Sequence, residues 1–111
     1  MASTITSVAV DQAGGATATM VAAKTGYKVQ IVGLCLSVGG AAVTVKSTLQ
    51  EITSNTVRMT LVGNATAPVV YEYSGGREAP AFETVIDEGV ELVTGTAAAI
   101  TGFINYRYVK A

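Results

Sequence analysis

Short apolar runs separated by glycines dominate this chain and restrict most strongly how it can fold. Valine, isoleucine and threonine supply 16, 6 and 15 of the 111 residues, together one third of the chain. These β-branched side chains lose rotamer freedom in a helix and pack well on a pleated strand. The twelve glycines fall mostly between the runs, where tolerance of positive φ favours turns. We therefore expect a sandwich or barrel of short strands.

Nine segments are predicted as strands, and no segment keeps apolar residues at helical spacing between proper helix caps. In the segment 57–62, Val57, Met59 and Leu61 alternate with polar residues and are expected to face the core. Such alternation marks one buried and one solvated face, as in antiparallel sheets. The fold class is therefore all-β and antiparallel. The predicted strands are 5–10, 17–23, 27–38, 42–49, 57–62, 68–73, 82–86, 90–94 and 98–109.

Two of these segments depart from simple alternation. In 27–38 the apolar residues occupy odd positions before Gly33 and even positions around and after it, which predicts a β-bulge or a strand buried on both faces. The last segment carries bulky groups on both faces, with Tyr106 and Tyr108 on one and Phe103 and Arg107 on the other. A lone thin sandwich cannot easily bury both sides, so this segment indicates self-association or a docking surface.

Length and charge narrow the class of protein further. A chain of 111 residues fits one domain, and half of its residues are hydrophobic against 14% charged, which excludes a disordered protein. The net charge of −1 predicts no nucleic-acid partner. The most apolar stretch, 29–45, is too short to span a bilayer and is interrupted by two glycines, so no membrane partner is expected. The first ten residues do not resemble a signal peptide.

Few residues are available for chemistry. With no histidine and one cysteine, the chain offers no zinc, copper or haem ligand cluster and no internal disulfide, so no cofactor and no enzymatic activity are predicted. Cys35, between leucines, is expected to be a small core residue. The acids Asp87, Glu88 and Glu91 indicate either a solvated turn that protects a sheet edge or a weak cation site.

Two further groups of residues have alternative interpretations. The loop 75–80 contains two glycines, a charged pair and a proline; it is either an ordinary connection or a contact loop with an arginine anchor. Five of the seven aromatic residues are tyrosines, at alternating positions typical of the core or of subunit contacts. Exposed tyrosines that stack on sugar rings are the other interpretation.

Several stretches resemble a known family. They are KVQIVGLCLSV at 28–38, then a Gly-Gly turn and AVTVKS at 42–47, with GVELVTGT at 89–96 and AAITGFINY at 98–106. Together they are similar to small jelly-roll proteins of tailed phages, and in particular to the capsid decoration (cement) proteins of epsilon15-like phages. The resemblance extends over about residues 22–109. Its motifs are structural rather than catalytic, so they specify the fold better than the role.

The resemblance implies a single antiparallel jelly-roll sandwich of about eight to nine strands at 7–111. The small, polar residues at the start of the sequence predict a flexible arm at 1–6 before it. It implies a decoration protein on the exterior of the virion, present in the host cytoplasm before assembly. Its implied partners are the major capsid protein, whose neighbouring subunits it clamps, and further copies of itself in a dimer or trimer. A carbohydrate-binding or a tail or fibre structural module of a phage is the alternative. Candidate capsid-contact residues are Ala2, Ser3, Thr4, Ile5, Thr6, Gly75, Gly76, Arg77, Glu78 and Pro80, and candidate self-association residues are Phe103, Tyr106, Arg107 and Tyr108.

Overall fold

The structure, a computed structural model, is all-β. It describes residues 4–40, 45–64, 66–76 and 78–110, and these form nine strands and no helix. None of them therefore builds a helix long and apolar enough to cross a lipid bilayer. The strands are β1 Thr6–Ala13, β2 Thr17–Val21, β3 Tyr27–Gly39, β4 Lys46–Glu51, β5 Val57–Val62, β6 Val69–Tyr73, β7 Phe82–Glu83, β8 Val90–Val93 and β9 Ala99–Lys110.

The strands form two antiparallel sheets. Sheet A has the order β1-β9-β3-β6, with β7 also paired to β3, and sheet B has the order β2-β8-β4-β5. All connections except β4–β5 and β6–β7 cross from one sheet to the other, so neighbours in a sheet are mostly distant in sequence. This arrangement is a jelly roll, in which two Greek keys build the two layers of a sandwich. The predicted fold class is confirmed.

The hydrophobic core lies between the two sheets. Alternate side chains of each strand point inward, as the pleat requires. The long strands β3 and β9 dominate sheet A and supply much of the core, while β4, β5 and β8 supply a central leucine each from sheet B. The largest fully buried apolar side chains are Ile31, Leu34, Leu36, Leu49, Leu61, Leu92, Ile100 and Ile104.

A β-bulge interrupts β3 at the position that the alternation predicted. Ile31 pairs with Tyr106 of β9, and Gly33 pairs with the adjacent Asn105, so Val32 is an extra residue with no partner of its own. The extra residue shifts the inward-facing positions from odd to even numbers, which keeps both Ile31 and Leu34 in the core. The sequence interpretation of a bulge near Gly33 is therefore confirmed.

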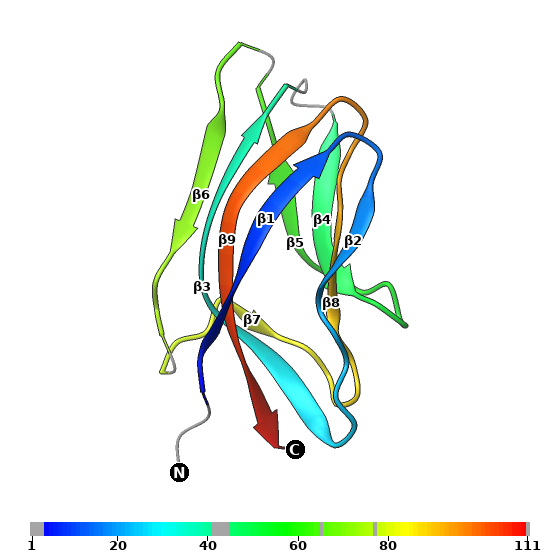
Figure 1. Cartoon of the computed structure of the whole chain (residues 1–111), viewed down its shortest axis with the longest axis vertical. Coiled ribbons are helices and arrows are strands. Elements are labelled where there is room, and N and C mark those ends of the chain that lie inside the picture. Colours follow the sequence, from blue (N-terminus) through cyan, green and yellow to red (C-terminus); the bar gives the residue numbers. More distant parts are fainter. Residues whose placement is uncertain (1–3, 41–44, 65, 77, 111) are drawn as a thin grey trace.

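The molecule is elongated, with extents of 45 × 26 × 18 Å. Figure 1 shows the strands running along the long axis, with the described N-terminal residues, the C-terminal end of β9 and the β2–β3 and β6–β7 connections at the lower end. The β1–β2, β5–β6 and β8–β9 connections lie at the upper end (Figure 1). The two ends of the sandwich therefore carry different sets of loops.

Several strand bounds and one side-chain position differ from the sequence predictions. The strand expected at 82–86 contracts to Phe82–Glu83, because the chain then leaves the sheet and exposes Val85 and Ile86. Val57 is also exposed, at 49%, instead of facing the core. It begins an edge strand, where a register shift opposite β4 turns it outward. Residues 42–44 of the predicted fourth strand lie outside the described residues.

Candidate functional site

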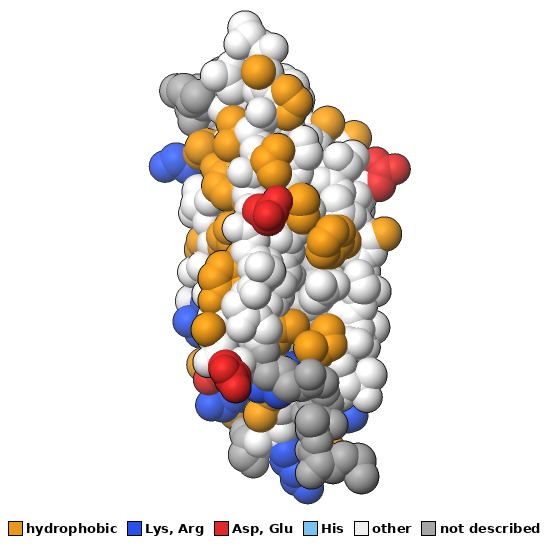
Figure 2. All heavy atoms as spheres, turned by 90° about the vertical axis from the view of Figure 1, so that its left-hand side faces the viewer, with side chains coloured by type: hydrophobic (Ala, Val, Ile, Leu, Met, Phe, Trp, Pro, Cys, Tyr) orange, Lys and Arg blue, Asp and Glu red, His pale blue; other side chains and the backbone are white. Residues whose placement is uncertain are grey.

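The outer face of sheet A is the surface on which the predicted contact segments meet. Its side chains are those that alternate with the buried ones, and the strand register places Ala9, Phe103, Cys35 and Glu72 in one row across β1, β9, β3 and β6. Figure 2, viewed from the side on which β6 lies, shows hydrophobic side chains spread over this side of the molecule and acidic groups isolated from one another. The side shown therefore carries apolar side chains between separated charges.

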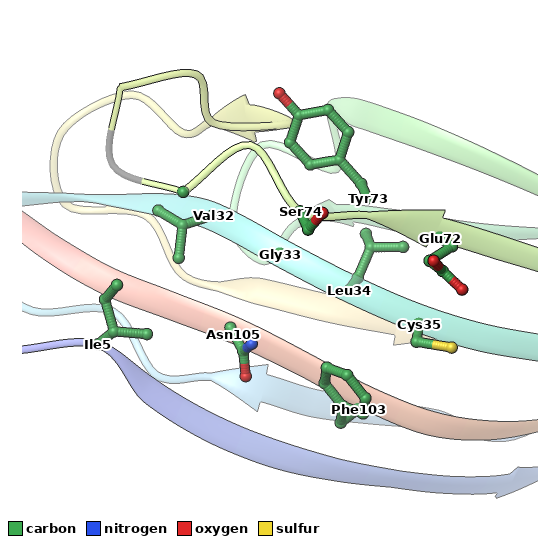
Figure 3. A pocket seen from close by; sticks show the side chains of 11 residues that line it. Ile5, Val32, Gly33, Leu34, Cys35, Glu72, Tyr73, Ser74, Phe103 and Asn105 are labelled. Atoms are coloured by element: carbon green, nitrogen blue, oxygen red, sulfur yellow. The ribbon is translucent and has the colours of Figure 1, made fainter.

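A hollow of about 490 Å³ lies in this face. Its lining comes from four segments: the chain just before β1, strand β3, strand β6 with the loop that follows it, and strand β9 (Figure 3). Gly33 leaves the β3 part without a side chain, and a Cβ there would lie 3.3 Å from the Tyr73 carbonyl oxygen. The lining residues are Ile5, Val32, Gly33, Leu34, Cys35, Glu72, Tyr73, Ser74, Gly76, Phe103 and Asn105.

Phe103 stands at the edge of this hollow. Its side chain is 42% exposed, which is a large apolar exposure for a residue in the middle of a central strand. Cys35 is its neighbour on β3, and Figure 3 shows the two side chains on adjacent strands. Next to it, Gly102 has a φ of +141°, and a Cβ at that position would lie 1.9 Å from the Cys35 carbonyl oxygen. Only glycine lets β9 and β3 approach this closely.

Polar contacts occupy the lower part of the same face. Gln30 donates a hydrogen bond from Nε2 to Glu83 Oε2 at 2.8 Å and accepts one from Arg107 Nε at 2.8 Å. Lys28 Nζ lies 3.5 Å from Glu83 Oε1. The hydrogen bond from Gln30 is the main reason that the pKa of Glu83 lies below its ordinary value, and it outweighs the opposing effect of burial.

The predicted capsid-contact segments lie at the same end of the sandwich. Ile5 and Gly76, one from each segment, line the same hollow, and Figure 1 shows the described N-terminal residues and the β6–β7 connection at the lower end. Thr6 is not in a free arm: it is the first residue of β1 and pairs with Tyr106. Tyr73 donates a hydrogen bond from its hydroxyl to the Ala79 carbonyl, which ties the loop to β6.

The other candidate residues of these two segments are exposed, half-buried or outside the described residues. Thr4, Gly75 and Glu78 are exposed, and Pro80 is half-buried beside β5 and β6. Ala2, Ser3 and Arg77 lie outside the described residues.

The four candidate self-association residues divide between the two sides of β9. Phe103 and Arg107 point outward on the face of sheet A, whereas Tyr106 and Tyr108 are half-buried and pack against the core. The separation of the two faces agrees with the predicted alternation. Burial, and secondarily the neighbouring Tyr106, raises the pKa of Tyr108. A surface built on β9 therefore contains Phe103 and Arg107 without the two tyrosines.

A tyrosine cluster closes the lower end of the core. Tyr108 packs edge-on against Tyr27 and Tyr106, with ring centroids 6.3 and 5.7 Å away, and donates a hydrogen bond to the Ala22 carbonyl at 2.6 Å. Lys24 Nζ lies 4.2 Å from the centroid of the Tyr27 ring. The cluster borders a small hollow of about 280 Å³. Because Lys24 and the neighbouring ring cover Tyr27, it is not a flat, open platform of the kind that a sugar ring stacks on.

The acidic turn and the cysteine have different surroundings from those expected. Asp87 accepts a hydrogen bond from the Gly26 N–H, Glu91 accepts one from the Gln50 amide, and Glu88 is buried and accepts the N–H groups that follow β4. The carboxylates thus bind separate parts of the chain, and no group of three or more possible metal ligands occurs among the described residues. Cys35, expected in the core, is partly exposed on the outer face because it occupies an outward position of β3.

Sequence reasoning missed Glu51, which is 1% exposed at the end of β4. Its carboxylate accepts hydrogen bonds from Arg58 Nη2 and Nε at 2.6 and 2.9 Å, from Ser54 Oγ at 2.8 Å and from the Val85 N–H at 3.1 Å. Burial acts to raise the pKa of Glu51, but these hydrogen bonds and the Arg58 charge together hold it below its ordinary value. The predicted fourth strand ended at residue 49, so the sequence pattern did not assign Glu51 to an inward strand position.

Comparison of the chain with protein-family models, with curated proteins and with solved structures finds no match.

Proposed function

We propose that this chain is a decoration protein of a tailed-phage head. It binds the exterior of the assembled shell and clamps neighbouring subunits of the major capsid protein. The sequence likeness to jelly-roll decoration proteins motivates the role, and the jelly roll is a fold used in viral capsids. A fold common to many functions is weak support by itself, so the proposal depends on the contact segments.

One observation carries the proposal most directly: both segments expected to contact the capsid lie at one end of the molecule and border one hollow. Ile5 comes from the first segment and Gly76 from the second, 71 positions further along the chain. A protein that clamps two subunits binds them more tightly when its contact segments lie side by side, because a single binding event then engages both segments. Binding only to assembled subunits stabilises the shell by mass action.

The charge of the molecule is compatible with this role. A net charge of −1 gives little long-range repulsion or steering. The affinity for a shell then comes from contact area repeated over many identical sites. No deep pocket or catalytic constellation is required.

Binding to undecorated phage heads tests the proposal. Deletion of residues 1–4 ends before β1, which begins at Thr6, and so removes contact groups without removing a sheet pair. Glu78→Lys reverses a charge in the β6–β7 loop. Both variants are expected to bind heads at least about tenfold more weakly in co-sedimentation, and Val57→Lys, on an exposed position of sheet B, serves as the matched control. Failure of the full chain to bind any head would refute the proposal.

A glycan-binding module of the virion is the second candidate, since tyrosines and threonines border the small hollow at the lower end. The covering of Tyr27 by Lys24 counts against it. Titration with lipopolysaccharide and a glycan array separate the two functions. Saturable sugar binding, together with no binding to heads, would favour the glycan module.

A further inference from the structure

We propose that the free edge of β6 binds an extended strand of another protein, and that this strand carries a basic residue between two apolar ones. The site lies on a different part of the molecule from the lower-end segments of the proposed function. It does not depend on that function, because any protein that presents such a strand can occupy it.

Strand β6 ends sheet A. Among the described residues it pairs only with β3, and in Figure 1 no strand lies beside it on the side away from β3. An edge strand presents a row of N–H and C=O groups to which another strand can pair. The five residues of β6 contain no proline and no register shift, two features by which edge strands avoid such pairing.

The backbone of β3 shows which residues of β6 point to the free edge. In an antiparallel ladder, successive residues direct their N–H and C=O groups to alternate sides of the strand. The Cys35 carbonyl points toward β9, because a Cβ on Gly102 of β9 would lie 1.9 Å from its oxygen. Leu36, the next residue of β3, therefore directs its groups toward its partner Tyr71 on β6.

The residues on either side of Tyr71 then face outward. Val70 and Glu72 each direct one N–H and one C=O away from β3, toward the free edge. Neither residue takes part in the other backbone hydrogen bonds of the described chain. An added antiparallel strand can therefore form hydrogen bonds with both residues without disturbing the β3–β6 ladder.

The other edge strands are less suited to pairing. On β5, the Tyr71 hydroxyl already accepts the Val62 N–H at 2.8 Å and donates to its carbonyl at 3.1 Å. Register shifts interrupt β2 and β5. Strand β1 is regular, but the side chains on its outer face, Ser7, Ala9 and Asp11, offer an added strand little apolar contact.

A hollow beside β6 can receive side chains of the added strand. It has a volume of about 330 Å³ and lies between β6 and β5, at the open edge of the sandwich. Met59, Tyr71, Pro80 and Phe82 line it, and the one cation in its lining, Arg58, is already paired within the chain. Alternate side chains of an added strand face this hollow. Backbone pairing combined with pockets for alternate side chains is how strand addition achieves affinity and specificity, so we expect apolar residues at these positions.

Glu72 determines the residue between them. It is exposed and has no hydrogen bond or ion pair with any other described residue. Figure 3 shows its side chain leaving β6 in a different direction from that of Tyr73. The residue opposite Glu72 on an added strand lies on the same face, with its Cβ about 5 Å away. A lysine or arginine there pairs with the carboxylate, whereas an acid is repelled.

A labelled peptide of alternating valine and lysine tests the site in a fluorescence-anisotropy titration of the full chain. We expect saturable binding, and at least about tenfold weaker binding of a matched peptide of alternating valine and glutamate. Methylation of the lysine backbone nitrogens should abolish binding, because in antiparallel pairing these N–H groups face β6. In amide exchange, the peptide should slow Val70 and Glu72 at least about tenfold and leave Tyr71 unchanged.

Two variants locate the binding on β6. Val70→Pro removes an outward N–H that β3 does not use, so it should weaken binding at least about tenfold and leave the sheet intact. Val70→Thr keeps this N–H and is the matched control, with an expected change below about threefold. Glu72→Lys should make the glutamate peptide the tighter of the two. Thermal melts identify a variant that fails to fold, and the charge reversal remains a test if Val70→Pro is one.

Several outcomes overturn the inference: no saturable binding, binding indifferent to methylation of the lysine nitrogens, or an unchanged order of the two peptides with Glu72→Lys. Self-association in sedimentation velocity that Val70→Pro abolishes also overturns it, because a second copy then occupies the edge. A chain that binds the peptide as expected but ignores phage heads supports the inference and refutes the proposed function. A chain that binds heads but no peptide does the reverse.

Discussion

Replacement of Glu51 by glutamine is the single substitution that best tests how buried polar contacts stabilise the sandwich. The substitution keeps the shape of the side chain but removes its charge and turns one acceptor oxygen into a donor. Four hydrogen bonds reach this carboxylate, two of them from Arg58 and the others from the Ser54 hydroxyl and the Val85 N–H. They join the end of β4 to β5 and to the segment after β7.

The size of the effect follows from the burial of each partner. Removing one member of a buried ion pair costs about 3–5 kcal/mol. The Arg58 side chain is 30% exposed, against 1% for Glu51, so water partly replaces the lost contact. We therefore expect Glu51→Gln to lower the free energy of unfolding by about 2–3 kcal/mol. At this chain length that corresponds to a fall of about 10 °C in the melting temperature.

Urea denaturation and thermal melts followed by circular dichroism measure this difference. Glu72→Gln is the matched control, because Glu72 is exposed on the outer face of sheet A and should change stability by less than about 0.5 kcal/mol. A double-mutant cycle with Arg58→Met isolates the pair and should give a coupling energy above about 1 kcal/mol. A loss below about 1 kcal/mol for Glu51→Gln, or a coupling energy near zero, would refute the reasoning.

Three other predictions concern stability. Hydrogen bonding holds the pKa values of Glu51 and Glu83 below 4.5, although burial of the two carboxyl groups acts to raise them. The ionised carboxylates therefore stabilise the folded state. This contribution is complete above about pH 4.5 and is lost as the pH falls through the lower pKa values of the folded state. Melting temperatures measured from pH 7 to pH 3 should therefore decline only below about pH 4.5, and less steeply in Glu51→Gln. Gly102→Ala should lose about 3 kcal/mol or more in urea titration, because its Cβ would collide with the β3 backbone. Gly26→Ala, with positive φ but open space around it, should lose about 1 kcal/mol, and equal losses would contradict the collision. Tyr71→Phe removes the hydroxyl that both donates to and accepts from the β5 backbone, so it should cost about 1–2 kcal/mol, and an unchanged melting curve would show that these contacts are unimportant.

Parts of the candidate site were accessible from the sequence because they depend on local pattern. The outward position of Phe103 on β9 followed from alternation along one strand, and so did the separation of Arg107 from Tyr106. The hollow was not accessible, because its lining comes from segments up to about 100 residues apart that only the strand order brings together. Cys35 was misplaced for a different reason, a local one. Its leucine neighbours predict burial, but an intervening position on a strand points to the opposite face.

Alternation, β-branched composition and glycine spacing determined the strands themselves, including the bulge before Gly33, because each of these signals acts over a few residues. Tertiary structure alone decided which strands became neighbours, how Glu51 found Arg58 and Val85, and that Ile5 and Gly76 border one hollow. These relations depend on chain crossings between two sheets, and no local pattern encodes the partner of a strand. The pleat assigns a side chain to a face, whereas the packing of the whole chain decides what that face meets.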